Sequence, residues 1–166
     1  MLIEMKVSEL TLDPVTNTPI LILKDIHDKN AIPIWIGIFE ASAIAMELEK
    51  VTFSRPMTHD LLKDVLDTFR INVSMIAITD LKNNTFFASI HLLKDGVELV
   101  VDSRPSDAIA LALRVKAPIF VDNKVIEKSR DIDFGTKMVD IDDVKKEKLK
   151  EFLENLSPED FGKYKM

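Results

Sequence analysis

The chain has 166 residues, of which 46% are apolar and 30% are charged, and it contains no cysteine. This is the composition of one globular domain that can bury a hydrophobic core, and it excludes a disulfide framework, a thiolate metal site and cysteine catalysis. The formal net charge of −6 argues against tight binding of nucleic acid along a dense cationic surface, although it leaves room for a small catalytic cleft.

The first part of the chain predicts strands. Residues Ile3–Val7 alternate between apolar and polar side chains, which is typical of a half-buried strand, and the alternation slips near Glu9, which suits a β-bulge. The apolar run Ile20–Leu23 predicts a strand covered on both faces, with Ile34–Ile36 as its return partner. Trp35 lies between two isoleucines, so we expect it in the core and not as a base-stacking platform.

Helices and a meander of strands are predicted next. Apolar residues at helical spacing predict a helix over Glu40–Lys50 and a second helix that begins at Thr58, with Thr58 as its N-cap. Three strands joined by short polar turns follow: Asn72–Asp80, Thr85–Leu93 and Val97–Asp102. A third helix and a short strand come after them: Ser106–Lys116 and Pro118–Val121. These elements indicate an α+β domain with a mixed, largely antiparallel sheet and helices packed on it.

The C-terminal part of the chain differs in character. Residues 142–150 are highly charged, yet apolar side chains recur at helical spacing from Leu149 to Leu156, which predicts an amphipathic helix. We therefore divide the chain into a domain of residues 1–135 and a C-terminal helical extension of residues 136–166.

The sequence shows neither a membrane segment nor a secretion signal. Its longest apolar stretches, such as Ile34–Phe39, fall far short of the roughly 20 residues that span a bilayer. The first residues lack the basic start and the apolar stretch of a signal peptide. We therefore expect a cytoplasmic protein without a membrane partner.

Arg55 and Arg104 each precede a proline that leads into a predicted helix. Backbone N–H groups at a helix N-terminus bind anions readily. Proline also keeps the preceding arginine extended, and the guanidinium could then fork onto phosphate oxygens. An equally good interpretation is structural, with the two arginines in salt bridges to Asp60 and Asp107.

Acidic side chains gather around the same turns. Asp102 ends a strand and Asp107 lies in the first turn of the next helix, so their carboxylates could ligate Mg²⁺ or Mn²⁺. Glu40 is a further candidate ligand. Such a cation would polarise a phosphate and activate water. The competing interpretation is that Asp60 and Asp107 only stabilise helix N-termini, where acidic residues are routine.

His59 is the best candidate for a general acid or base, because imidazole titrates near neutrality. The competing interpretation is a surface histidine in the first turn of a helix. Thr58 and Ser106 are hydroxyl residues of the same two turns, and we assign them to substrate binding. The predicted catalytic residues are His59, Asp60, Arg55, Arg104 and Asp107.

Two blocks of the sequence are specific in combination: Arg55-Pro56-Met57-Thr58-His59-Asp60 and Asp102-Ser103-Arg104-Pro105-Ser106-Asp107-Ala108. Further blocks accompany them: Ile32–Gly37, Glu40-Ala41, Thr85–Ala88, Pro118–Val121 and a tail at Phe152–Phe161. Taken in order, these blocks resemble the bifunctional nuclease (BFN) domain family. The resemblance implies an α+β fold, a nuclease acting on DNA and RNA, and association as a homodimer.

Two functions remain open. The first is a metal-dependent phosphodiesterase acting on nucleic acid, with metal ligands drawn from Glu40, Asp102 and Asp107, and with Asp60 as a further candidate. The second is a non-enzymatic dimeric module, in which the Arg-Pro turns bind a small anion or another ligand, or brace a subunit interface. The position of the acidic side chains distinguishes the two, because carboxylates that point to separate places cannot form one metal site.

Overall fold

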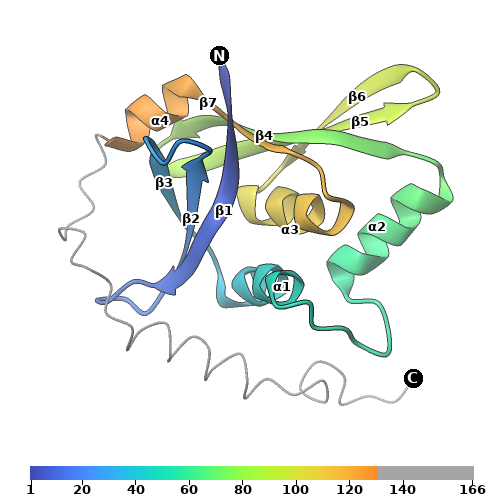
Figure 1. Ribbon diagram of the computed structural model, residues 1–166, viewed down its shortest axis with the longest axis horizontal. Helices are drawn as coiled ribbons and strands as arrows, with labels where there is room; N and C mark the ends of the chain where they lie inside the picture. Colours follow the sequence, from blue (N-terminus) through green and yellow to red (C-terminus); the bar gives the residue numbers. More distant parts are fainter. Residues whose placement is uncertain (131–166) are drawn as a thin grey trace.

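A computed structural model describes residues 1–130, which form a seven-stranded sheet and four helices (Figure 1). The strands are β1 Leu2–Leu12, β2 Pro19–Asp25, β3 Ala31–Trp35, β4 Asn72–Lys82, β5 Thr85–Lys94, β6 Val97–Ser103 and β7 Ile119–Asp122. Their order in the sheet is β3-β2-β1-β7-β4-β5-β6, and every neighbouring pair is antiparallel except β4 and β7. The predicted α+β class, with a mixed and largely antiparallel sheet, is confirmed.

The helices are α1 Ile38–Leu48, α2 Thr58–Thr68, α3 Pro105–Val115 and α4 Asn123–Arg130. Helix α3 is the central one, because α1 and α2 both pack against it and Ala108–Ala112 are all buried. The alanines of this stretch let neighbouring elements approach closely. In Figure 1, α3 and α4 lie on opposite sides of the strands, and α4 packs against β3, β4 and β7.

The strand β7 joins the two halves of the sheet. It pairs antiparallel with β1 and parallel with β4, so the last strand of the described chain lies at the centre of the sheet. The predicted irregularity in β1 is confirmed as a register shift between Val7 and Glu9. The predicted meander of β4, β5 and β6 is confirmed as well.

Two local expectations are wrong. Thr58 is the first residue of α2 and not its N-cap; Met57 is the N-cap, and its N–H donates to Oδ2 of Asp60 at 3.0 Å. Trp35 is 36% exposed, because its indole N–H bonds Asp13 at the surface and keeps the ring out of the core. The helix α4 was not expected from the sequence.

Residues 1–130 contain no helix that is long and apolar enough to cross a membrane. The predicted C-terminal extension of residues 136–166 lies outside the described residues. The boundary that we placed at residue 135 lies outside them too.

Candidate active site

A pocket of about 320 Å³ lies where the first turns of α1, α2 and α3 meet. Its polar lining comprises Glu40, Ser42, Thr58, His59, Arg104, Asp107 and Arg114, and its apolar lining comprises Phe39, Ala43, Met46 and Met57. Residues of both predicted turns therefore reach one pocket. The topology explains this convergence, because α1 and α2 pack against the helix that the second Arg-Pro turn begins.

Four side chains of this pocket form a continuous hydrogen-bonded chain. His59 Nε2 lies 3.0 Å from Asp107 Oδ1, and Arg104 Nε donates to Asp107 Oδ2 at 2.8 Å. Arg104 Nη1 donates in turn to Glu40 Oε1 at 2.9 Å. The chain links the N-terminal turns of all three helices and places an imidazole, a guanidinium and two carboxylates within one cluster.

Asp107 is the centre of this chain. Burial raises the pKa of its carboxyl, but the hydrogen bonds from Arg104 and His59 outweigh burial and hold the pKa below its ordinary value. The carboxylate is therefore ionised at neutral pH, and its Oδ1 accepts a hydrogen bond from His59 in the tautomer that carries the proton on Nε2. The other ring nitrogen, Nδ1, makes no hydrogen bond to a residue of the described chain.

A second ion pair fixes the helices behind the pocket. The Arg114 side chain is only 5% exposed, and its Nε donates to Asp60 Oδ1 at 2.6 Å. Its two Nη groups donate to the carbonyl oxygens of Ala110 and Ala43. Asp60 also accepts the Met57 N–H, so both of its carboxylate oxygens serve structural contacts. These contacts favour the structural interpretation of Asp60.

Two contributors to the site were missed in the sequence. Arg114 holds α1, α2 and α3 together, and its only sign in the sequence is an arginine directly after the apolar run Ala108–Leu113. Gly37 precedes α1 and leaves space for Glu40, because a Cβ atom at position 37 would collide with the Glu40 carboxylate. In the sequence, the only sign of this role is a glycine three residues before a glutamate in the first turn of the helix. The Glu40 carboxylate can therefore fold back towards the start of α1 and meet Arg104.

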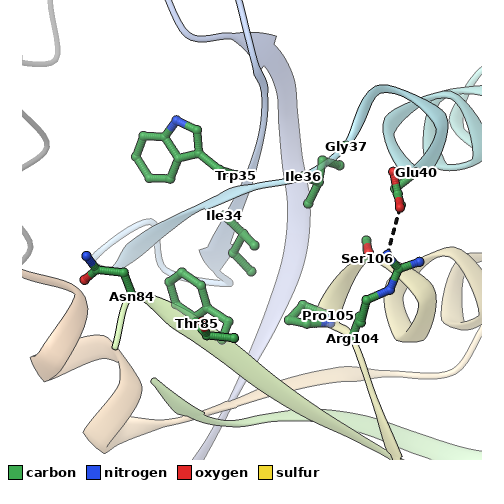
Figure 2. A pocket seen from close by; sticks show the side chains of 11 residues that line it. Ile34, Trp35, Ile36, Gly37, Glu40, Asn84, Thr85, Arg104, Pro105 and Ser106 are labelled. Atoms are coloured by element: carbon green, nitrogen blue, oxygen red, sulfur yellow. Dashed lines mark hydrogen bonds and ion pairs between the residues drawn. The ribbon is translucent and has the colours of Figure 1, made fainter. Parts of the chain in front are cut away.

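Besides Asp60, three predicted residues do not line this pocket. Arg55 is exposed in the loop before α2, does not line the pocket, and makes no ion pair within residues 1–130. Asp102 is exposed on β6. Ser106 is buried and lines a neighbouring pocket that also includes Glu40 and Arg104 (Figure 2). Thr58, in contrast, lines the pocket.

The fit of this site to a divalent cation is partial. In the part of the chain that the structure describes, no three His, Asp or Glu side chains come together as a metal-binding group, so Glu40, Asp102 and Asp107 do not form one. Of the three predicted metal ligands, Glu40 and Asp107 come closest to a shared site, but Arg104 forms an ion pair with each of them. A cation at their oxygens must therefore compete with the guanidinium.

Comparison with known proteins gives the family. The model of the bifunctional nuclease domain matches residues 21–133, which is more than half of the chain. The chain belongs to the bifunctional nuclease domain family. An uncharacterized protein of Mycobacterium tuberculosis strain H37Rv is 36% identical over 164 residues, covering 95% of this chain and 97% of that protein.

Plant members of the family are more distant and longer. Bifunctional nuclease 2 of Arabidopsis thaliana is 32% identical over 110 residues, which is 63% of this chain and 33% of the plant protein. Bifunctional nuclease 1 of the same plant is 31% identical over 116 residues, or 67% and 35% of the two chains. The shared part is thus about a third of each plant nuclease.

We predict that Asp60→Ala lowers the free energy of unfolding at neutral pH by about 2–3 kcal/mol. The substitution leaves the buried Arg114 cation without its carboxylate, and the loss stays below the ~3–5 kcal/mol of a fully buried pair because Asp60 is 37% exposed and partly screened by water. Chemical denaturation measures the effect. Asp64→Ala, one turn along the exposed face of α2, is the matched control and should stay within about 0.5 kcal/mol.

The Asp60 pair should also add to acid sensitivity. Burial raises the pKa of Asp60, but the hydrogen bonds from Arg114 and the Met57 N–H bring it below its ordinary value of 3.8. The folded state then binds fewer protons than the unfolded chain, so this stabilisation is complete above about pH 4 and is lost as the pH falls through the folded pKa. Equal acid sensitivity of Asp60→Ala and the parent chain would contradict this account.

Proposed function

We propose that this protein hydrolyses phosphodiester bonds in DNA or RNA, and that the pocket between the three helix N-termini is its active site. Membership of the bifunctional nuclease domain family supports the nuclease activity. The observation that carries the assignment to this pocket is the His59–Asp107–Arg104 contact, because it joins an acid–base group to a phosphate-binding group. Both functions promote hydrolysis of a phosphodiester.

Arg104 is the proposed phosphate-binding residue. Its side chain is 64% exposed, and hydrogen bonds to Asp107 and Glu40 raise its pKa further above neutrality. A guanidinium has five N–H donors, and the bonds to the two carboxylates use two of them. The remaining donors can bind the oxygens of a phosphate while the carboxylates keep the side chain oriented.

His59 is the proposed general base. Asp107 fixes the ring through Nε2, so Nδ1 can accept a proton from an attacking water molecule. The ionised Asp107 then stabilises the imidazolium that forms. A later transfer of this proton to the leaving oxygen would complete the reaction without a change in the total charge of the site.

We also propose Mg²⁺ or Mn²⁺ as the cofactor. Glu40 and Asp107 bring two negative charges for the single positive charge of Arg104, and this excess opposes the approach of a phosphate. Glu40 and Asp107 would hold the cation, with phosphate oxygens and water as its other ligands. A bound divalent cation would supply charge neutralisation and polarisation of the phosphate.

We predict that His59→Ala and Asp107→Asn each lower the rate of oligonucleotide cleavage by about a hundredfold or more, because each removes part of the acid–base pair. The assay needs highly purified protein, since a trace of host nuclease would mimic activity. His27→Ala, in an exposed loop, is the control and should keep the parent rate. Melting temperatures of all variants separate a catalytic loss from unfolding.

Equal cleavage rates in the parent, His59→Ala and Asp107→Asn preparations would contradict the catalytic assignment. Binding of nucleic acid without any cleavage would instead support the non-enzymatic module that the sequence leaves open.

We predict that excess EDTA abolishes cleavage and that Mg²⁺ or Mn²⁺, added beyond the chelator, restores it. The physical reason is the excess of negative charge around Arg104, which the cation must neutralise. Initial rates on one oligonucleotide, with and without chelator, measure the effect. Full activity after exhaustive chelation would show that Arg104 alone provides enough positive charge.

We further propose that the protein is a homodimer that pairs through β6. This strand lies at one edge of the sheet, and four of its apolar residues are 46–58% exposed: Val97, Leu99, Val100 and Val101. An exposed apolar edge is a template for pairing with another strand. Two copies of β6 can pair antiparallel about a two-fold axis, because each then offers the same edge to the other. A second copy of the chain is therefore the partner that suits this edge.

Light scattering during size exclusion at micromolar concentration should give about twice the chain mass of 18.8 kDa. Val100→Lys should shift the mass towards that of the monomer, because it adds a charge to the edge. Val15→Lys, in an exposed turn away from this edge, should keep the dimer. A monomer mass for the parent chain would refute the proposal.

A further inference from the structure

A second pocket, of about 270 Å³, adjoins the proposed active site. The two pockets share Glu40 and Arg104, so the ion pair between these residues lies on their common boundary. The lining of the second pocket is mostly apolar and aromatic, with contributions from Ile34, Trp35 and Phe86. Figure 2 shows Trp35 and Asn84 at one end of this pocket and Arg104 at the other.

Trp35 is held in place at the rim of this pocket. Its indole Nε1 donates to Asp13 Oδ2 at 3.0 Å, while the Val15 and Thr16 N–H groups bond Asp13 Oδ1. The contact fixes the edge of the indole, and the residue as a whole is 36% exposed. A large aromatic ring with a fixed orientation loses little entropy when a planar group stacks on it. The sequence context, between two isoleucines, gave no sign of this exposure.

Asn84 supplies a polar group at the same end of the pocket. It lies in the two-residue turn between β4 and β5, where Asn83 and Asn84 both have positive φ, of 49° and 58°. Within residues 1–130 its side-chain amide makes no hydrogen bond. An amide both donates and accepts, which matches the mixed donors and acceptors on the edge of a nucleobase.

We propose that this second pocket binds the base of an unpaired nucleotide whose phosphate lies at Arg104, and therefore that the protein acts on single-stranded nucleic acid. This inference rests on the proposed function. The arrangement matches a nucleotide: a planar apolar group at the aromatic end and a phosphate at the guanidinium end. A base inside a duplex is stacked on both faces and paired along its edge, so only an unpaired or extruded base can enter.

The size of the pocket agrees with this ligand. Its volume of about 270 Å³ is near the lower end of the roughly 300–1,000 Å³ that small-molecule sites span. A pocket of this volume suits one small ligand unit, such as a single base, and not a base pair. The shared Arg104 also explains why the base and the phosphate would be bound together and not at separate sites.

The intrinsic fluorescence of the protein tests base binding directly, because Trp35 is the only tryptophan in the chain. Titration with adenosine 5′-monophosphate should quench the emission in a saturable way, since the base stacks on the indole. Ribose 5-phosphate, which has the phosphate but no base, should leave the emission unchanged. Free tryptophan titrated with the same nucleotide corrects for absorption of the exciting light. No saturable quenching, or equal responses to both compounds, would overturn the proposal.

Variants test the same idea on a labelled single-stranded oligonucleotide, with binding followed by fluorescence anisotropy. Trp35→Ala should weaken binding by about 5- to 150-fold, the loss expected for one stacked base, and Trp35→Phe should restore most of it. Asn84→Gly keeps the left-handed turn and removes the amide, so it should weaken binding about 2- to 10-fold. Phe69→Ala removes an exposed aromatic ring outside both pockets and should bind as the parent does.

The outcomes separate this inference from the proposed function. Base-dependent quenching without any cleavage would support the base pocket and contradict the nuclease. Equal cleavage of single strands and duplexes, together with unchanged binding by Trp35→Ala and Asn84→Gly, would overturn the base pocket and leave the nuclease intact.

Discussion

The buried guanidinium of Arg114 is the interaction on which the geometry of the site depends. A cation that is almost completely removed from water needs its hydrogen-bond partners, and a missing partner costs several kcal/mol. Arg114 draws these partners from three helices: a carbonyl of α1, the Asp60 carboxylate of α2, and a carbonyl of its own helix α3. The helices are therefore held in one arrangement, which brings Glu40, His59 and Asp107 together.

Arg114 lies in α3 and Arg104 is the N-cap of this helix. The two arginines differ in burial, and this difference gives them different roles. Arg114 uses its donors on structural partners in the interior. Arg104 lies at the surface, contacts two carboxylates, and retains donors for a ligand. From sequence alone, a salt bridge and a phosphate contact were equally good explanations of Arg104. The structure shows the salt bridge, and in the proposed site the two explanations are compatible, because the carboxylates orient the guanidinium.

Most local features of residues 1–130 could be predicted, although helix α4 and the N-cap of α2 were missed, and strand pairing and side-chain contacts over long sequence distances were harder to predict. Sequence patterns identified all seven strands of residues 1–130, since the side-chain period is a local property, although β3 begins at Ala31 and not at the predicted Ile34. The central place of β7 depends on pairing with β1 and β4, distant in sequence, and no local pattern encodes it. Likewise, the sequence identifies His59 as a candidate acid or base and Asp107 as a candidate carboxylate of the site. Their contact, however, results from helix packing. Trp35 is partly exposed and bonds Asp13, which is distant in sequence, and its exposure was missed for the same reason.

The acidic character of the chain constrains how it can hold nucleic acid. A protein with a formal net charge of −6 gains little from releasing counterions along a phosphate backbone, which is the main source of affinity for basic binding proteins. Affinity must then come from contacts that do not depend on net charge. A stacked base at Trp35 provides such a contact, and Arg104 adds one phosphate beside it. In the proposed site, the affinity for nucleic acid therefore comes from one nucleotide bound across the shared boundary of the two pockets. In basic binding proteins it comes from an extended cationic surface.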